Sequence, residues 1–382
     1  MSESSRQANL PVGKQIRRRL LDNPSYRPHT RTARPLPNEL VATPCLVIFE
    51  DGVRHNLLQT ASACGGVERL MPHVKTHRAP WIVELLLVQG VTAFKCATPA
   101  EAEMVLAAGG KKVTWAYPTA NSFHIHRFIE CARRYPDAEL TGMVDSERGL
   151  EVWRAELRNV PGNIRLWIDL DPGLGRTGIP MDDSALKLAR SVHKLGRLAG
   201  WHVYDGHIKG SRAERLDQVL ALADSVSALK DRLKGENIES EVIAGGSYTF
   251  NLWPRSLTRF VSPGSWTYSS AQHDTELADL EWRPSAFVLT TVISVHENTA
   301  TLDAGSKAIS PDKPLAERFR WDGRIIMMNE EHVVVENSDL RVGDRVLLMP
   351  QHACTTAYLY DTALVKTVSG GWEDRRQLGC AR

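Results

Sequence analysis

The strongest constraint on the fold is a repeated alternation between short apolar runs and segments with helical spacing. From about residue 43 the chain contains eight such runs, rich in β-branched residues, each followed by a segment with helix-like periodicity. The runs span residues 70–76, 91–98, 112–118, 139–145, 164–171, 198–207, 241–247 and 258–265. Strands that alternate with helices pair in parallel, and eight such units close a (β/α)8 TIM barrel. A doubly wound open sheet is the alternative, but its glycine-rich first turn is missing here.

The pattern changes at about residue 285. Five strand-like segments follow, with short turns and no helical spacing between them, which predicts a small all-β domain. Before residue 43 the chain is rich in arginine, proline and polar residues. We therefore predict an N-terminal arm over residues 1–43, a barrel over residues 44–284 and a C-terminal β domain over residues 285–382.

The overall composition argues against several classes of partner. The net charge is +2 and the pI is about 8.2, so we expect no nucleic-acid or membrane partner. No apolar stretch is long enough to span a bilayer, and the first residues lack the apolar core of a secretory signal. Six scattered cysteines in a chain of 382 residues indicate reduced thiols. We expect a cytoplasmic protein.

A barrel carries its chemistry at the carboxyl ends of its strands, and Lys75 lies at the end of the first run. If this segment is a strand, His73 and His77 share the face of Lys75. A lysine inside an apolar strand is costly to bury as a cation, and the uncharged amine is the nucleophile of imine chemistry. A strand-end lysine that simply reaches solvent is equally compatible with these residues.

Two further groups follow strand ends and suit anionic ligands. The seventh run is followed by a turn that offers backbone N–H groups and hydroxyls without bulk, as a phosphate requires. Its residues are Gly245, Gly246, Ser247 and Thr249. Arg176 lies between two glycines after the fifth run and is a candidate for binding an anionic oxygen. An ordinary turn and an ordinary loop arginine are the alternatives.

A potential metal pair lies in the C-terminal domain. His352 and Cys354 follow an apolar run, and on an extended segment residues two apart point to one side. An imidazole and a thiolate favour zinc over manganese or magnesium. Two ligands are not a complete site, so substrate, water or another side chain would have to complete the shell. An incidental pair is the alternative.

Together these segments resemble the family of D-threonine aldolases and D-serine dehydratases, which are relatives of bacterial alanine racemase. The resemblance runs from about Thr43 to Val368. Its most specific motif is PHVKTH at residues 72–77, the cofactor-lysine motif of the family. The other matching segments, in chain order, are CATPAEAEM (96–104), DPGLGRTG (171–178), YDGH (204–207), GGSYT (245–249), LDAGSKAIS (302–310) and PQHACTT (350–356).

The resemblance implies a fold-type III enzyme with pyridoxal 5'-phosphate bound as a Schiff base to Lys75. It implies a divalent metal, with zinc favoured and manganese as the alternative, on His352 and Cys354. It also implies a head-to-tail homodimer whose active site lies where the barrel meets a β domain. The remaining cofactor-binding positions that it implies are His73, Arg176, Tyr204, His207, Gly245, Gly246, Ser247 and Thr249.

The predicted activity is that of a lyase on a small D-3-hydroxy amino acid. A His-x-Cys pair is typical of the dehydratases, so we expect D-serine dehydratase-like release of a 2-oxo acid and ammonia. Cleavage to glycine and an aldehyde, as by D-threonine aldolase, is the main alternative. Racemisation and non-catalytic cofactor carriage are the others. Trp266 stands where relatives usually carry tyrosine. Because of this departure, the resemblance does not assign the residues on the substrate side of the pocket.

Overall fold

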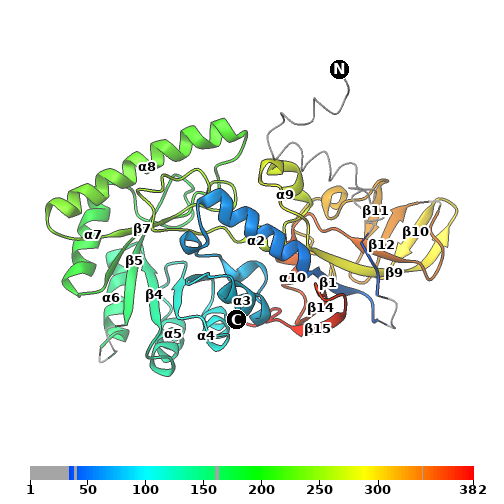
Figure 1. Cartoon of the computed structure of the whole chain (residues 1–382), viewed down its shortest axis with the longest axis horizontal. Helices are drawn as coiled ribbons and strands as arrows, with labels where there is room; N and C mark the ends of the chain where they lie inside the picture. Colours follow the sequence, from blue (N-terminus) through cyan, green and yellow to red (C-terminus); the bar gives the residue numbers. More distant parts are fainter. Residues whose placement is uncertain (1–33, 38–40, 159, 161–162, 338) are drawn as a thin grey trace, which may run out of the picture.

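The computed structural model describes residues 34–37, 41–158, 160, 163–337 and 339–382. Most of the predicted arm over residues 1–43 lies outside this range. The described chain forms a barrel with helices around it and a β domain at one side (Figure 1). The long ribbon of α2 (Glu50–Cys64) runs along the junction of the two parts.

The barrel is built from parallel strands in sequential order. They are β2 (Phe94–Cys96), β3 (Lys112–Trp115), β4 (Glu139–Val144), β5 (Ile164–Leu170), β6 (Leu198–Val203), β7 (Glu241–Ala244) and β8 (Phe260–Val261). Residues 70–73 close the sheet, because Leu70 bridges to Val261 and His73 bridges to Lys95, both in parallel. The predicted (β/α)8 barrel is therefore confirmed. Its first strand is reduced to two bridges, since Pro72 has no N–H to donate to the ladder.

Helices follow the strands and cover the outside of the barrel (Figure 1). The helices are α3 (Pro80–Val88), α4 (Pro99–Ala107), α5 (Ser122–Arg134), α6 (Glu147–Glu156), α7 (Asp183–Lys194) and α8 (Arg212–Gly235). Side chains cap the first turns of all of these helices except α3. The Thr98 hydroxyl accepts from the Glu101 N–H at 3.2 Å, and Ser211 forms a capping box with Glu214. The helical segments predicted between the strands are thus helices, and capping side chains mark where most of them begin.

The interior of the barrel changes character along its axis. One layer of it is apolar and contains Met71, Ala93, Met143, Trp167, Ala199, Ile243 and Phe260. Toward the carboxyl ends, the inward positions that follow become polar. Lys95 comes two residues after Ala93, Asp169 two residues after Trp167, and His202 lies on β6 beside them; all three are buried. The polar site is therefore built at the carboxyl end of the barrel.

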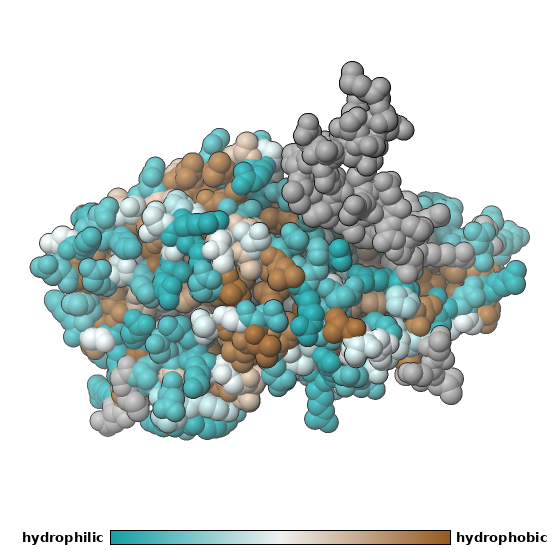
Figure 2. Space-filling view, viewed as in Figure 1, coloured by the Kyte–Doolittle hydropathy of each residue, from teal (hydrophilic) through white to brown (hydrophobic). Residues whose placement is uncertain are grey.

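The C-terminal part is a mostly antiparallel β domain with its own core. It contains β9 (Ala286–His296), β10 (Thr299–Leu302), β11 (Ile325–Met328), β12 (Val333–Glu336), β13 (Arg345–Leu348), β14 (Thr362–Lys366) and β15 (Trp372–Arg376). Its core includes Val292, Leu302 and Leu348. Figure 2 shows that apolar side chains on the visible face form small groups between polar ones. Within the described ranges, no helix has the length and apolar character needed to cross a bilayer.

One strand departs from the predicted domain division. β1 (Cys45–Phe49) was assigned to the barrel by the boundary at residue 44, but it pairs with β9 and β14 of the β domain. Its alternate residues serve both parts. Leu46 and Ile48 pack in the barrel's core, whereas Val47 and Phe49 pack in a cluster with Phe287. This pairing joins residues more than 200 positions apart, so local sequence patterns carry no sign of it. The other predicted boundaries stay predictions.

Candidate active site

Lys75 lies at the carboxyl end of the barrel and borders three neighbouring cavities. It is not on a strand, because Val74–Thr76 form a 3-10 turn in which the Lys75 N–H donates to His73 Nδ1 at 3.4 Å. Its side chain is exposed, so of the two alternatives left open by the sequence, a lysine that reaches solvent agrees with the structure and a lysine buried in a strand does not. His77 is buried instead, and its Nδ1 accepts from the Ala79 N–H at 3.1 Å. The turn breaks the two-residue period on which the shared face depended.

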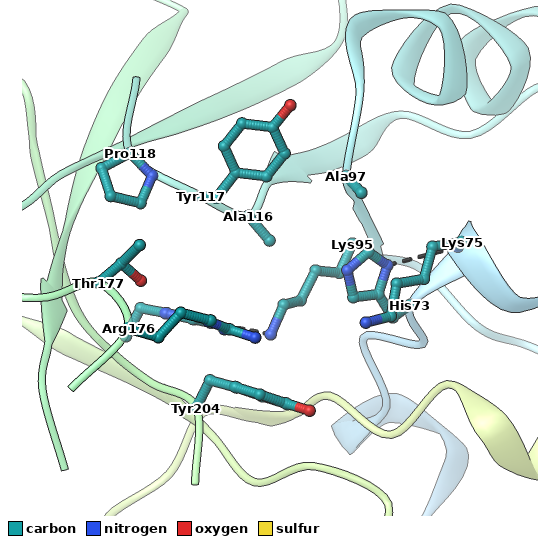
Figure 3. Close-up of a pocket in the computed structure, with 11 residues that line it drawn as sticks. His73, Lys75, Lys95, Ala97, Ala116, Tyr117, Pro118, Arg176, Thr177 and Tyr204 are labelled. Atoms are coloured by element: carbon teal, nitrogen blue, oxygen red, sulfur yellow. Dashed lines mark hydrogen bonds between the residues drawn. The ribbon is translucent and has the colours of Figure 1, made fainter. Parts of the chain in front are cut away.

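Tyr204 forms one side of a cavity of about 320 Å³ that Lys75 also borders. The Arg176 guanidinium carbon lies 4.6 Å from the centre of the Tyr204 ring, and Lys75 Nζ lies 5.9 Å from it. Figure 3 shows these side chains converging above the ring, with Thr177 and Pro118 along the far side. The predicted residues His73, Lys75, Arg176 and Tyr204 therefore share one cavity, which a flat cofactor ring could occupy between Tyr204 and the opposite wall.

A second amine in this cavity was missed by the sequence analysis. Lys95 is only 3% exposed, and its Nζ lies 2.8 Å from His202 Nε2. Burial, followed by the neighbouring charge of Lys75, lowers the pKa of Lys95 to about 7. The sequence did contain an indication of it, since Lys95 lies two residues after the inward-facing Ala93 and therefore points to the same side of the strand. Only the closed barrel shows that His202 meets it.

The predicted phosphate turn borders a smaller cavity of about 90 Å³. Gly246 and Ser247 line this cavity directly, whereas Gly245 and Thr249 do not. Thr249 is fully buried and donates to Asp205 Oδ1 at 2.7 Å. The Gly246 N–H donates to the same oxygen at 3.0 Å, so Asp205 holds the shape of the turn. Thr249 thus supports the cradle from behind.

The residues of this smaller cavity fit a phosphate group. Ser262 is 4% exposed and lines the cavity, and its Oγ has no hydrogen-bond partner in the protein. A buried hydroxyl without a partner is costly, so a bound anion would satisfy it. A Cβ on Gly264 would come within 2.8 Å of the His73 carbonyl oxygen, so this wall admits no side chain. Lys209 adds a cation at the rim. Together with Lys75, the two cavities fit pyridoxal 5'-phosphate.

Two residues singled out in the sequence do not border these cavities. His207 is exposed and borders none of the three. Trp266 is fully buried, and its indole N–H donates to the Pro263 carbonyl at 3.2 Å. The neighbouring Ser265 faces the cavities instead. Trp266 therefore shapes the wall from behind and does not touch a ligand there.

The predicted metal pair faces Lys75 across the largest of these three cavities, about 710 Å³ in volume. His352 is the extended N-cap of α10 (Ala353–Ala357), and Cys354 lies in the first turn of that helix. The extended segment assumed from the sequence is therefore wrong for Cys354, yet both side chains line the same cavity. Cys354 Sγ is 3.4 Å from the Thr76 hydroxyl, one residue beyond Lys75.

The donor chemistry of this pair suits a soft divalent metal. Burial opposes ionisation of Cys354, but the interaction with His352 outweighs it and lowers the pKa of the thiol to about 7. His352 Nδ1 lies 2.5 Å from Asp312 Oδ2, which leaves Nε2 as the nitrogen for a metal. Among the described residues, no cluster of three or more His, Cys, Asp or Glu side chains could hold a metal. Substrate or water would supply the remaining ligands.

Two family models match the chain. The "Alanine racemase, N-terminal domain" matches residues 48–272, which is more than half of the chain. The "Putative serine dehydratase domain" matches residues 285–366. The two matches correspond closely to the barrel and the β domain.

Individual proteins that match this chain share only a low sequence identity with it. The D-threo-3-hydroxyaspartate dehydratase of Delftia sp. (strain HT23) is 25% identical, covering 82% of this chain and 91% of the relative. The D-threonine aldolase of Arthrobacter sp is 26% identical, covering 78% and 81% respectively. The crystal structure of the D-threonine aldolase from Filomicrobium marinum superposes with a TM-score of 0.80 at 22% identity, over 90% of this chain and 97% of that one. This structural likeness supports the fold.

Proposed function

The chain belongs to the alanine racemase-like, fold-type III family, and from this premise we propose that it is a pyridoxal-phosphate-dependent lyase of D-3-hydroxy amino acids. The observation that carries the proposal is the shared cavity. The amine of Lys75 and the pair His352 and Cys354 border the same space of about 710 Å³. A carrier or a racemase would leave this second pair of functional groups without a role.

The cofactor, when bound, supplies an electron sink for the bonds at the Cα atom of an amino acid. Gly246, Ser247 and Ser262 would hold its phosphate, and Tyr204 would pack against its ring. The nitrogen of Lys75 would attach the cofactor and then hold the proton taken from the substrate's Cα atom. Arg176 would bind an anionic oxygen on the ring, as its position above Tyr204 allows.

A metal on His352 and Cys354 would act as a Lewis acid on the substrate's β-hydroxyl. Loss of the Cα proton together with that hydroxyl removes water and leaves an enamine, whose imine form water hydrolyses to a 2-oxo acid and ammonia. Loss of the hydroxyl proton with cleavage of the Cα–Cβ bond releases an aldehyde, and Cα then takes up a proton to give glycine. A soft thiolate ligand suits zinc better than manganese. The His-x-Cys pair also supports dehydration, because such a pair is typical of the dehydratases that this chain resembles. We therefore favour dehydration, and retro-aldol cleavage is the second candidate because one relative is a D-threonine aldolase.

The residues that border the large cavity are compatible with a small, charged amino acid as substrate. Besides the functional groups, the large cavity is bordered by Arg78, Glu101 and Arg382. Arg78 is paired with Glu101 at 3.3 Å, whereas Arg382 Nε contacts the Tyr358 hydroxyl at 3.2 Å. Charged side chains at this wall suit the ammonium and carboxylate groups of D-serine, D-threonine or D-3-hydroxyaspartate. The head-to-tail homodimer and the cytoplasmic location stay predictions.

A product assay tests this proposal. Purified protein is incubated with pyridoxal 5'-phosphate, zinc and each of these three D-amino acids, with the L-enantiomers as controls. We expect 2-oxo acid and ammonia in equal amounts from at least one D-substrate. Glycine with an aldehyde would establish the second candidate. No product from any substrate, with cofactor bound, would contradict a lyase.

A further inference from the structure

A second lysine reaches the ring of Tyr204 from β2, which is the strand next to the segment that leads into Lys75. Lys95 Nζ lies 5.8 Å from the ring centre, and Lys75 Nζ lies 5.9 Å from it. Figure 3 shows both side chains extending toward the ring, Lys75 from the turn after the first strand and Lys95 from β2. The two amines border the same cavity of about 320 Å³, but Lys75 is exposed whereas Lys95 is buried. The cavity thus holds two amines in different environments.

Lys95 is held by a chain of hydrogen bonds from two further strands. Its Nζ lies 2.8 Å from His202 Nε2, and His202 Nδ1 lies 2.7 Å from Asp169 Oδ1. The Thr177 hydroxyl donates to the other oxygen of Asp169 at 2.9 Å. An ionised carboxylate only accepts, so His202 donates from Nδ1 and its Nε2 accepts from Lys95. This sequence of donors fixes the position of Nζ and leaves its other hydrogens directed at the cavity.

The same arrangement determines which group changes its charge. Burial, followed by the charge of Lys95, lowers the pKa of His202 to about 4, so His202 is neutral at neutral pH. The pKa of Lys95 is lowered to about 7, as described above, so Lys95 is still largely protonated when the pH falls below neutrality. The charged or titratable groups that act on Lys95 and its partner His202 are Lys75, Asp169, Asp205, Arg176 and His73.

We propose that Lys95 is a positioning residue of the cofactor site, whose ammonium group favours loss of the proton from the nitrogen of Lys75. The inference rests on the proposed attachment of the cofactor to Lys75. A like charge nearby disfavours the protonated form of a neighbouring nitrogen. His202 and Asp169 serve this function by keeping the cation beside the ring of Tyr204. Lys95 therefore influences how readily the proton is lost, whereas Lys75 is the residue that carries the proton.

The test is a pH titration of the yellow absorbance band of the bound cofactor in the full-length protein. In Lys95→Met we expect the titration midpoint to rise by about one pH unit, because a neighbouring positive charge is removed. Lys95→Arg keeps the charge, so its midpoint should lie at or below that of the wild type. Lys95→Gln, which is neutral and polar, provides the same comparison should the methionine variant fail to fold.

Thr114→Val is the matched control for a disturbance of packing. Thr114 is buried in the same barrel and its hydroxyl lies 2.7 Å from that of Thr141, but it carries no charge. We expect it to keep the wild-type midpoint. An unchanged midpoint in both neutral Lys95 variants, or an equal rise in Thr114→Val, would overturn the proposal.

Chemical trapping separates this inference from the proposed function. Reduction of the wild-type protein with borohydride, followed by peptide mapping, should place the cofactor on Lys75. Cofactor found on Lys95 would overturn the positioning role. A wild-type protein that develops no yellow band with pyridoxal 5'-phosphate would contradict the proposed function itself.

Discussion

The barrel wall and the β-domain wall of the site around Lys75 are built in different ways. On the barrel wall, which borders the cavity of about 320 Å³, polar side chains are fixed by buried hydrogen bonds, as in the chain from Lys95 through His202 to Asp169. On the β-domain wall the pair His352 and Cys354 has one carboxylate behind it, Asp312, and the side chains of His352 and Asp312 are 31% and 34% exposed. The barrel wall is thus largely preorganised, whereas the β-domain wall supplies two ligands and leaves further positions to substrate or water.

This difference suggests that the two walls have separate functions in the reaction. A preorganised wall suits a cofactor that stays bound throughout turnover, since its fixed dipoles require no rearrangement during the reaction. A wall with open ligand positions suits a group that must engage a different hydroxyl in each turnover. The barrel wall would then determine that chemistry occurs at Cα, and the β-domain wall would determine which bond at Cβ breaks.

Removing the amine from the barrel wall should have the largest effect. For Lys75→Ala we expect turnover to fall about 10⁴-fold, the upper end of what a positioned proton carrier contributes, with loss of the yellow absorbance band. Steady-state kinetics and an absorbance spectrum check this. Lys187→Ala, which changes an exposed lysine on the outer helix α7, should keep the band. A Lys75→Ala protein that retains both band and turnover would remove Lys75 from the site.

Removing the ligands of the β-domain wall should have the next largest effect. For His352→Ala and Cys354→Ala we expect turnover to fall roughly 10³-fold, because Lewis-acid stabilisation contributes about 4 kcal/mol. The cofactor's absorbance should persist, since Lys75 and the barrel wall are intact. Chelation of the wild type should reproduce the loss, and added zinc should reverse it. Normal turnover after complete metal removal would show that both walls act without a metal.

Weakening the support of that wall should have a smaller effect. Asp312→Asn removes the charge behind His352 Nδ1 but keeps a hydrogen-bonding side chain of the same shape. We expect metal affinity to fall about 10- to 100-fold, as for other carboxylates that orient a ligating histidine. A competition titration with a chromophoric chelator measures this directly. Asp322→Asn, a carboxylate elsewhere in the same domain, is the control. Equal affinities in the wild type and Asp312→Asn would show that His352 is held without Asp312.

Parts of the molecule were predictable because their determinants are local. The alternation of runs with periods of two and of three to four residues predicted the strands and helices of the barrel, since side-chain direction follows backbone geometry. The turn at Gly246 and Ser247 and the position of Arg176 followed from the rule that sites form at the carboxyl ends of strands. The placement of Lys75 at the cavity followed in the same way, although its exposure did not.

Other features depend on which distant segments meet. Lys95, His202 and Asp169 come from three strands, and only the closure and stagger of the barrel bring their polar atoms within 3 Å. The burial of Thr249 behind the phosphate turn and the exposure of His207 depend on how each loop leaves its strand. The sequence by itself determined the barrel, its lysine and its glycine-rich turn. The tertiary structure decided which amine is buried, because burial is set by neighbours that are remote along the chain.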